Sequence, residues 1–231
     1  MIPDKNLFIV TSSIKPKIGV FSPEQRFAQT LFTLRSIRKK VPDAIILLSD
    51  TSISPLSDFE KKVLSQNSNL YFDLSEEPAT KHYTSNGQKS HAENALLFAT
   101  LQTLKNNPNV SNVLNSVKRV FKFSGRSELD DNFNINDYDD LFGKFVFKKR
   151  IPTWMGDIKH DATHLFITRM YSFCPSLIDT YLSVLNKNMS IVNVLDTEHA
   201  HFVNIPKNYL VEFEKIHCMG WLAGNGEIEH Y

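Results

Sequence analysis

The chain has 231 residues, of which 42% are hydrophobic and 22% are charged, and its formal net charge at pH 7 is +1. This composition is ordinary for a globular protein and excludes a disordered, a collagen-like and a disulfide-scaffold chain. Because 26 Lys and Arg residues nearly balance 25 Asp and Glu residues, no overall positive field draws the chain to nucleic acid or to an anionic membrane.

The first elements along the chain are a short apolar strand and a well-marked helix. Leu7–Val10 is an apolar run that predicts a strand. Ser22 is predicted to cap a helix that begins at Pro23, and Gln25 stands where it can complete a capping box. Pro42 is expected to end this helix, because proline cannot continue the backbone hydrogen bonding.

The same alternation continues to about residue 123. The sequence predicts a strand over 44–48, a helix from 54–55 to about 65, a strand over 70–72, an irregular polar stretch over 75–89, a helix over about 90–106 and a strand over 119–123. Alternating strands and helices are typical of an α/β fold, with a mostly parallel central sheet flanked by helices on both faces.

The second half is less regular, and it shows no internal repeat, low-complexity segment or clear linker. Strands are predicted over 145–147, 164–168 and 211–216, a helix over 175–185, and a loop around Trp154. We therefore expect a single domain over residues 1–231.

Hydroxyl and carboxylate side chains follow several of the predicted strands. They are Thr11, Ser12, Asp50, Asp73 and Ser124. Ligands of open α/β sheets bind outside the carboxyl ends of the strands, so we expect this set to form a binding edge. The alternative for any single member is that it serves as a turn residue or helix cap.

The most informative segment is VFKFSGRSELDDNF, residues 120–133, where an apolar strand runs into Glu128, Asp130 and Asp131. Carboxylates this close in sequence repel one another unless a cation joins them. Carboxylate and phosphate oxygens are the usual ligands of Mg²⁺ and Mn²⁺. Arg126 lies near enough in sequence to bind a phosphate. The alternative is a solvated acidic loop.

Three β-α units followed by a strand and an acidic triplet resemble the GT-A fold of nucleotide-sugar glycosyltransferases. The segment FKFSGRSELDDNF resembles in particular a group of small glycosyltransferases of bacteria and large DNA viruses, of the chlorella-virus type, in which K-x-S/T-G-R precedes the acidic loop. The resemblance extends in outline from Leu7 to about Gly220. The triplet is Glu128-Leu129-Asp130 rather than a strict D-x-D, so either Glu128 or Asp131 would pair with Asp130 on a metal.

The resemblance implies a GT-A-like domain whose residues 1 to about 130 bind a nucleotide sugar and whose residues 131–231 bind the acceptor. It implies a hexosyltransferase-type enzyme that moves a sugar from a nucleoside-diphosphate donor, with a UDP-sugar such as UDP-glucose expected, to a hydroxyl group of a glycan or glycoprotein. A divalent cation, Mn²⁺ or Mg²⁺, would neutralise the leaving diphosphate. The oligomeric state is left open.

The site residues implied by the resemblance fall into two sets. The donor would contact Thr11, Ser12, Ser13, Asp50, Lys89, Ser90, Ser124, Gly125 and Arg126. The metal would be held by Glu128, Asp130, Asp131 and His217, the last from an H-x-x-G pattern. Lys89 and Ser90 stand at a predicted helix N-terminus, which is a natural site for an anion, and Gly125 would let a ligand approach the backbone.

Catalysis is assigned to Asp130, through the metal, and to Glu198 of the segment Asp196-Thr197-Glu198-His199. Glu198 would take the proton from the acceptor hydroxyl as it attacks the anomeric carbon. The alternative for Glu198 is a residue that merely begins a helix. Trp154 would stack on a sugar face, or it is simply packed against its neighbours.

Three other interpretations stay open. One is a non-catalytic module that binds nucleotide sugars. A second is a sugar nucleotidyltransferase, which would normally show a glycine-rich loop after the first strand, where this chain has TSSIKPK at 11–17. A third is a metal-dependent phosphohydrolase built on His160-Asp161 and His164, although that chemistry usually places its His-Asp pair on helices.

The cysteines and the hydropathy pattern bear on the compartment. Cys174 and Cys218 match no metal-binding or redox spacing, so both are expected to be reduced residues of the core. The sequence shows no signal-peptide pattern and no apolar run of the ~18 residues that a membrane span needs. We therefore expect a cytoplasmic protein without a transmembrane segment or a nucleic-acid partner.

Overall fold

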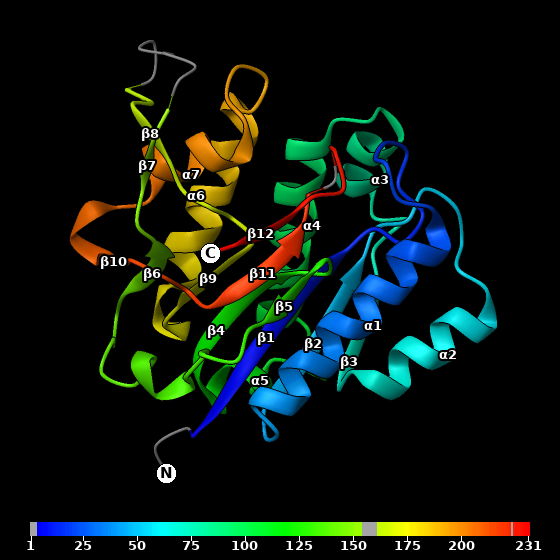
Figure 1. Cartoon of the computed structure of the whole chain (residues 1–231), viewed down its shortest axis with the longest axis horizontal. Helices are drawn as coiled ribbons and strands as arrows, with labels where there is room; N and C mark the ends of the chain where they lie inside the picture. The colour runs from blue at the N-terminus through cyan, green and yellow to red at the C-terminus, as the bar shows by residue number, and fades with distance from the viewer. Residues whose placement is uncertain (1–3, 154–160, 223) are drawn as a thin grey trace.

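Strands and helices alternate along the first half of the chain in the computed structural model, which describes residues 4–153, 161–222 and 224–231 (Figure 1). The strands are β1 (Lys5–Ser12), β2 (Ile45–Asp50), β3 (Leu70–Asp73), β4 (Val117–Ser124), β5 (Ser127–Leu129), β6 (Phe145–Lys148), β7 (Ile151–Pro152), β8 (His164–Leu165), β9 (Met170–Phe173), β10 (Leu210–Phe213), β11 (Cys218–Trp221) and β12 (Ile228–His230). The helices are α1 (Pro23–Lys40), α2 (Asp58–Asn67), α3 (Pro78–Ser85), α4 (Lys89–Asn106), α5 (Asn112–Asn115), α6 (Ile178–Ile191) and α7 (Thr197–Asn204), with 3-10 turns η1 (Ile135–Tyr138), η3 (Pro175–Leu177) and η4 (Lys207–Tyr209).

The central sheet is mostly parallel. In the described part of the chain it has seven strands in the order β10-β6-β9-β4-β1-β2-β3. The β1–β2, β1–β4, β2–β3 and β10–β6 pairs are parallel, whereas β9 runs antiparallel to its neighbours β4 and β6. The predicted α/β class with a mostly parallel sheet is therefore confirmed. Strands from both halves of the chain build this one sheet.

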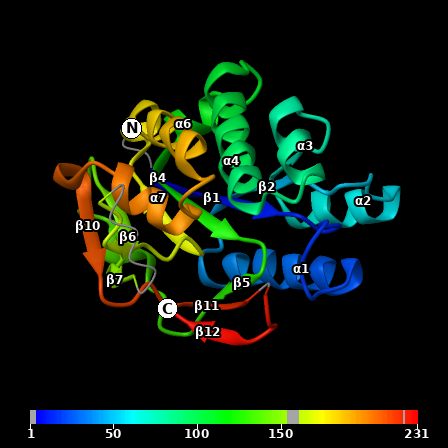
Figure 2. The ribbon, with the colours of Figure 1, turned by 90° about the horizontal axis from the view of Figure 1, so that it is seen from above.

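Helices cover both faces of the sheet, as the predicted class requires (Figure 2). Helix α1 lies on one face together with the small antiparallel sheet of β12, β11 and β5, and helices α3, α4 and α6 lie on the other. Neighbouring residues of a strand point to opposite faces. Phe8 of β1 therefore packs in the core that includes Leu34 of α1, and Leu7 packs in the core that includes Leu101 of α4.

Helix α1 begins and ends as its sequence predicts. The Ser22 side chain accepts a hydrogen bond from the Gln25 backbone N–H at 3.3 Å, and the Gln25 side chain accepts one from the Ser22 N–H at 2.8 Å. This reciprocal pair is the predicted capping box. The helix ends at Lys40, two residues before Pro42. The capping box fixes where the loop after β1 joins the helix.

Two of the predicted helical regions differ from the structure. Helix α2 begins at Asp58 rather than at 54–55, because Ser57 and Glu60 form its capping box. The stretch over 75–89 was predicted to be irregular, but it contains the helix α3. The Glu77 side chain caps the first turn of this helix. This helix was missed because its eight residues are mostly polar and carry no apolar periodicity.

The second half also differs in detail from its prediction. The strand predicted over 164–168 is limited to β8, and the helix predicted over 175–185 is a 3-10 turn followed by the longer α6. Strand β9 was not predicted as an element, and a helix that begins at Glu198 was given only as the alternative for that residue, which α7 confirms. Both matter for the site, since β9 inserts between β4 and β6 and α7 follows Asp196.

A tight turn carries the chain from the central sheet into the small one. After β4 the chain turns at Gly125 and Arg126 into β5, which pairs with β11 so that Ser127 lies opposite Gly220. A Cβ atom on Gly220 would lie 2.6 Å from the Ser127 Oγ, so any other residue here would force Ser127 to move. The Leu129 N–H donates to Ser36 Oγ of α1 at 3.3 Å, which places β5 along that helix.

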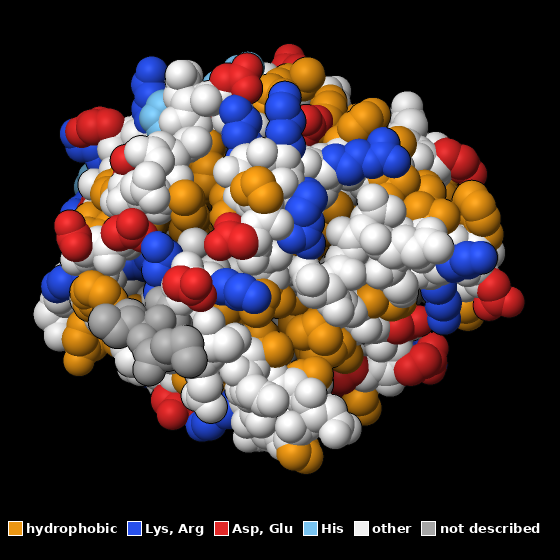
Figure 3. All heavy atoms as spheres, turned by 90° about the horizontal axis from the view of Figure 1, so that it is seen from below, with side chains coloured by type: hydrophobic (Ala, Val, Ile, Leu, Met, Phe, Trp, Pro, Cys, Tyr) orange, Lys and Arg blue, Asp and Glu red, His pale blue; other side chains and the backbone are white. Residues whose placement is uncertain are grey.

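The hydropathy of the helices, the surface charges and the cysteines complete the description of the fold. None of the helices in the described ranges is long and apolar enough to cross a membrane. Acidic and basic side chains are interspersed over the face in Figure 3, in keeping with the near-zero net charge. Cys174 and Cys218 are both free, and Cys218 is buried in the core as predicted, whereas Cys174 is half-buried.

Candidate functional site

A cavity of about 350 Å³ opens at the carboxyl ends of β1, β2 and β4. Its walls come from the loop after β1, the start of α4, the residues that follow β4, the residues just before β9 and the start of α7. This is the edge at which ligands bind in open α/β sheets. We refer to this cavity as the cleft.

The cleft brings together many of the residues singled out in the sequence. Those that line it are Thr11, Ser12, Ser13, Lys89, Ser90, Ser124, Arg126 and Glu198. Segments nearly 190 residues apart in sequence thus meet at one surface, because parallel strands place their carboxyl ends side by side.

Asp50 and Gly125 lie beneath the cleft and do not line it. The Asp50 carboxylate is 1% exposed and accepts hydrogen bonds from the Ile14 N–H at 3.2 Å and from the Ser52 N–H at 3.0 Å. Burial raises the pKa of Asp50, and these bonds oppose the rise. A Cβ atom on Gly125 would lie 3.1 Å from the Thr11 carbonyl oxygen. Both residues therefore shape the loop after β1.

The acidic residues after β4 also lie outside the lining of the cleft. Asp131 has a 92% exposed side chain that pairs with Lys40 at 2.7 Å. Glu128 stands opposite Met219 in the small sheet. These acidic side chains lie away from the cleft because, after the turn that follows Ser124, the chain runs along α1 and not across the ends of the strands.

Two of the predicted metal ligands do lie near each other, with 3.6 Å between Asp130 Oδ1 and His217 Nδ1. In the described ranges, however, no three His, Cys, Asp or Glu residues are grouped so that they could hold a metal ion. The structure therefore does not assemble the four predicted ligands, Glu128, Asp130, Asp131 and His217, into one set.

The cleft is rich in cations, of which the sequence predicted only Lys89 and Arg126. Its described lining contains six Lys and Arg residues, Lys17, Arg26, Lys89, Lys122, Arg126 and Arg169, against three acidic residues, Glu93, Asp196 and Glu198. Lys122 had a detectable signal, since it is a charged residue between Phe121 and Phe123 of strand β4. Arg26 and Arg169 had none, because they lie far from the acidic segment in sequence.

The positive charges at the cleft perturb one another. Burial lowers the pKa of Arg126 to about 9, and the charges of Arg169 and Arg26 add to the effect. Lys89 lies at the mouth of the cleft, where desolvation and the charge of Arg126 lower its pKa. Such mutual repulsion favours the binding of an anion.

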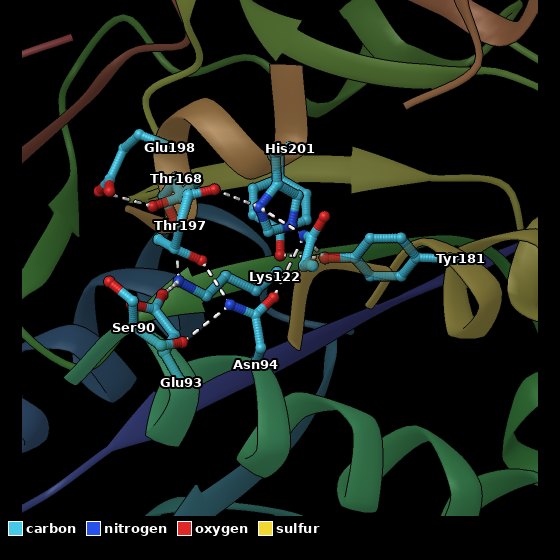
Figure 4. Close-up of polar contacts among 11 residues, drawn as sticks. Ser90, Glu93, Asn94, Lys122, Thr168, Tyr181, Thr197, Glu198 and His201 are labelled. Atoms are coloured by element: carbon cyan, nitrogen blue, oxygen red, sulfur yellow. Dashed lines mark hydrogen bonds and ion pairs between the residues drawn. The ribbon is translucent and has the colours of Figure 1, made fainter. Parts of the chain in front are cut away.

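An ion pair between a buried lysine and a half-buried glutamate forms the floor of the cleft (Figure 4). The Lys122 ammonium donates to the Glu93 carboxylate at 2.5 Å and to the Thr168 carbonyl oxygen at 2.8 Å, and its side chain is 2% exposed. Desolvation by itself would raise the pKa of Glu93, but Lys122, Lys89 and Arg169 outweigh it and lower the pKa to about 2. Glu93 is therefore a permanent anion that holds Lys122 in place.

Glu198 lies in the first turn of α7 and faces the cleft. Its Oε1 accepts a hydrogen bond from the Thr168 hydroxyl at 3.0 Å, as Figure 4 shows. Burial raises the pKa of Glu198, and the negative charges of Glu93 and Asp196 raise it further. A carboxylate with a raised pKa is a stronger base than an ordinary glutamate.

Polar contacts fix the position of α7 and hence of Glu198. The Asn94 amide of α4 donates to the Thr197 hydroxyl at 2.7 Å. The His201 Nε2 shares a hydrogen bond with the Tyr181 hydroxyl at 3.0 Å. The Nδ1 of the same ring lies 2.7 Å from the Thr197 carbonyl oxygen. Burial lowers the pKa of His201 to about 4, so this imidazole is neutral at pH 7 and serves as a structural link.

Two residues named in the sequence analysis lie outside the described ranges. They are Trp154, expected to stack on a sugar, and His160 of the phosphohydrolase interpretation.

Comparison with known proteins gives no relative by sequence. A scan against models of known protein families finds no match, and a search among curated proteins finds none.

Solved structures do match the fold. Core-mannan synthase A of Aspergillus fumigatus, in its Mn/GDP form, is 8% identical with a TM-score of 0.51 over 92% of this chain and 73% of that protein. The galactosyltransferase LgtC, with donor and acceptor sugar analogues, is 10% identical with a TM-score of 0.51 over 90% and 73%. The mannosyltransferase Ktr4p of S. cerevisiae is 6% identical with a TM-score of 0.52 over 90% and 68%. At these identities the similarity shows the fold, so the GT-A-like fold implied by the resemblance is confirmed.

Proposed function

We propose that the protein transfers a sugar from a nucleoside-diphosphate sugar to a hydroxyl group of a glycan or glycoprotein acceptor. The observation that carries the proposal is the cleft itself, in which Glu198 and the cations Lys89 and Arg126 line one cavity at the strand ends. The solved structures of similar fold are named as mannosyl- and galactosyltransferases, which supports sugar transfer as the reaction. A UDP-sugar such as UDP-glucose stays our expected donor.

In this proposal the donor binds to side chains at the strand ends. Thr11, Ser12 and Ser13 offer hydroxyl and backbone groups at the end of β1, and Ser124 offers a hydroxyl at the end of β4. The start of α4 faces the same space, and the positive end of a helix dipole favours a phosphate there. We therefore place the diphosphate of the donor between α4 and Arg126.

Glu198 is the proposed catalytic base. Its carboxylate takes the proton of the acceptor hydroxyl while the acceptor oxygen forms a bond to the anomeric carbon. The bond from that carbon to the diphosphate oxygen breaks, and the diphosphate leaves with the electron pair. The Thr168 hydroxyl orients Glu198, and the Lys122 bond to the Thr168 carbonyl oxygen holds Thr168.

The cleft is a poor fit for the Mn²⁺ or Mg²⁺ ion that the resemblance implies. A divalent cation would neutralise the leaving diphosphate, but the predicted ligands diverge and the cleft they were to serve is lined by an excess of cations. The described residues therefore do not fit such an ion at the cleft, and no step of the mechanism is assigned to one.

The proposal is tested by incubating the protein with UDP-glucose, UDP-galactose and GDP-mannose, each with a set of alkyl glycoside acceptors. We expect one donor to release its nucleoside diphosphate and form a glycoside. Glu198→Gln should slow this reaction by about 10²-fold or more, which is the usual contribution of a general base. Glu214→Gln is the matched control, since that side chain is 79% exposed. Equal rates for Glu198→Gln and the wild type would contradict the role of Glu198.

A further inference from the structure

Four cations of the cleft share one feature, which is that none has a carboxylate partner. Arg26 comes from α1, Lys89 from α4, Arg126 from the turn after β4 and Arg169 from the residue before β9. Among the residues that the structure describes, no carboxylate oxygen lies within the 4.0 Å of an ion pair from any of the four. The nearby Glu93 is already paired with Lys122.

Two of these cations, Arg126 and Arg26, are held in place by backbone carbonyl groups. Arg126 is 8% exposed, and one of its guanidinium nitrogens donates to the Trp221 carbonyl oxygen. The Arg26 Nε donates to the Ser13 carbonyl oxygen at 3.1 Å, and this arginine is half-buried. Neutral carbonyl groups orient both side chains, and within the described ranges neither guanidinium has a carboxylate in direct contact. A cluster of this kind is preorganised for an anion.

For Arg26 and Arg126, burial lowers the pKa most, and the charges of neighbouring cations lower it further. Burial lowers the pKa of Arg26 to about 10. The negative charge of Asp50 opposes this change, and the positive charge of Arg169 adds to it. Burial also lowers the pKa of Arg126, and Arg169 and Arg26 again add to it. An anion bound between these groups would remove the repulsion and gain charge-assisted hydrogen bonds.

The start of α4 adds a second feature that suits the same ligand. The N-cap residue Gln88 makes no hydrogen bond from its side chain to the helix, and Gln88, Lys89 and Ser90 all line the cleft. Two phosphate groups carry enough negative charge to balance several of the four cations. A diphosphate is therefore the anion that this end of the cleft fits.

We propose that Arg26, Lys89, Arg126 and Arg169 neutralise the diphosphate of the nucleotide, so that binding and departure of the diphosphate require no divalent cation. This inference rests on the proposed function and states how the same site handles the charge of the leaving group. It differs from the expectation drawn from the sequence, in which Glu128, Asp130, Asp131 and His217 hold Mn²⁺ or Mg²⁺.

Calorimetric titration of the full chain with UDP, with GDP and with inorganic pyrophosphate tests the inference. Each titration is run in EDTA and again with Mn²⁺ or Mg²⁺. We expect one of the nucleotides to bind in EDTA with a dissociation constant within about threefold of that measured with the metal, a difference well below the tenfold that 1.4 kcal/mol represents. Binding that appears only with the metal would overturn the inference and leave the proposed function standing. No binding under either condition would overturn the proposed function as well.

Variants of single cations identify the site. Lys89→Gln and Arg126→Gln should each weaken nucleotide binding in EDTA by about tenfold or more, because each removes a charge-assisted contact. Arg35→Gln is the matched control, since Arg35 is an exposed arginine of α1 outside the cleft. Lys89→Gln serves as the second variant because Arg126 also bonds to Trp221 and its loss can disturb folding. Unchanged affinity in folded Lys89→Gln and Arg126→Gln would overturn the assignment.

Discussion

Replacement of Lys122 by Met gives the sharpest test of the floor of the cleft. The Lys122 side chain is 2% exposed, and its ammonium bonds to Glu93 and to the Thr168 carbonyl oxygen. Met has a similar length but carries no charge, so Lys122→Met leaves the Glu93 carboxylate without its closest counter-charge. Removal of one partner of such an ion pair is destabilising, because the half-buried Glu93 charge is left without its counter-charge.

The expected loss of folding stability follows from the pKa of Glu93, which is lowered from 4.5 to about 2 in the folded chain. At ~1.4 kcal/mol per pKa unit, the lowered pKa corresponds to about 3 kcal/mol of stability. A carboxyl group with a lowered pKa contributes this stability above the pKa of the unfolded chain. The contribution is lost as the pH falls toward the folded pKa, and at pH 3 about 1 kcal/mol remains.

Thermal unfolding at a series of pH values measures the effect. Lys122→Met should lower the Tm by roughly 6–12 °C at pH 7, since 1 kcal/mol shifts a chain of this size by about 2–4 °C. The difference from the wild type should shrink as the pH approaches 3. Lys105→Met is the control, because its pair with Asp179 lies at the surface and is expected to contribute less than about 1 kcal/mol. A loss below about 1 kcal/mol at pH 7, or one that does not change with pH, would refute the reasoning.

Three further predictions concern the site and its support. The pKa that governs the acid limb of the kcat/KM profile should lie above that of an ordinary glutamate, because burial raises the pKa of Glu198 and its charged form is the base. An acid-limb pKa at or below the ordinary glutamate value would contradict this role. Gly220→Ala should destabilise the fold by about 1–3 kcal/mol, as overpacking does, because the new Cβ atom would meet Ser127 Oγ. Gly224→Ala is the control, since a Cβ atom there meets nothing within 4 Å, and equal Tm values for the two variants would contradict the prediction. Asp130→Asn should keep most of the transfer rate, since Asp130 lies outside the cleft, and loss of transfer in that variant would restore the metal hypothesis.

The first half of the fold could be predicted because its signals are local. The capping box of Ser22 and Gln25 marks the start of α1, and the apolar runs mark the strands of a parallel sheet. Once the strands are parallel, the hydroxyl residues at their ends must share one edge. Thr11 and Ser124, which lie side by side in the register of β1 and β4, follow from this rule.

The course of the chain after β4 could not be predicted, because it depends on a distant partner. Strand β5 pairs with β11, and the contact of Ser127 with Gly220 joins segments about ninety residues apart. Nothing in the acidic segment itself indicates this pairing. The carboxylates of Glu128 and Asp131 were therefore expected at the strand ends, while the structure places them outside the cleft.

The cationic side of the cleft was recognised in part. Lys89 and Arg126 were predicted as donor contacts from their positions at a helix start and a strand end, and both line the cleft. Arg26 and Arg169 come from elements whose mutual placement is a tertiary property. Strand β9, which brings Arg169 beside β4, is four residues long and has too little periodicity to be predicted.

The measurement that tests the central claim most directly is thermal unfolding of the full chain with a panel of nucleoside-diphosphate sugars. A ligand at about 100 times its dissociation constant adds about 2.7 kcal/mol of stability. For a chain of this size that corresponds to a rise in Tm of roughly 5–11 °C. We predict such a rise for at least one nucleotide sugar, and its loss in Arg126→Gln and Lys89→Gln. The absence of a shift with every nucleotide sugar at millimolar concentration would contradict a donor site in the cleft.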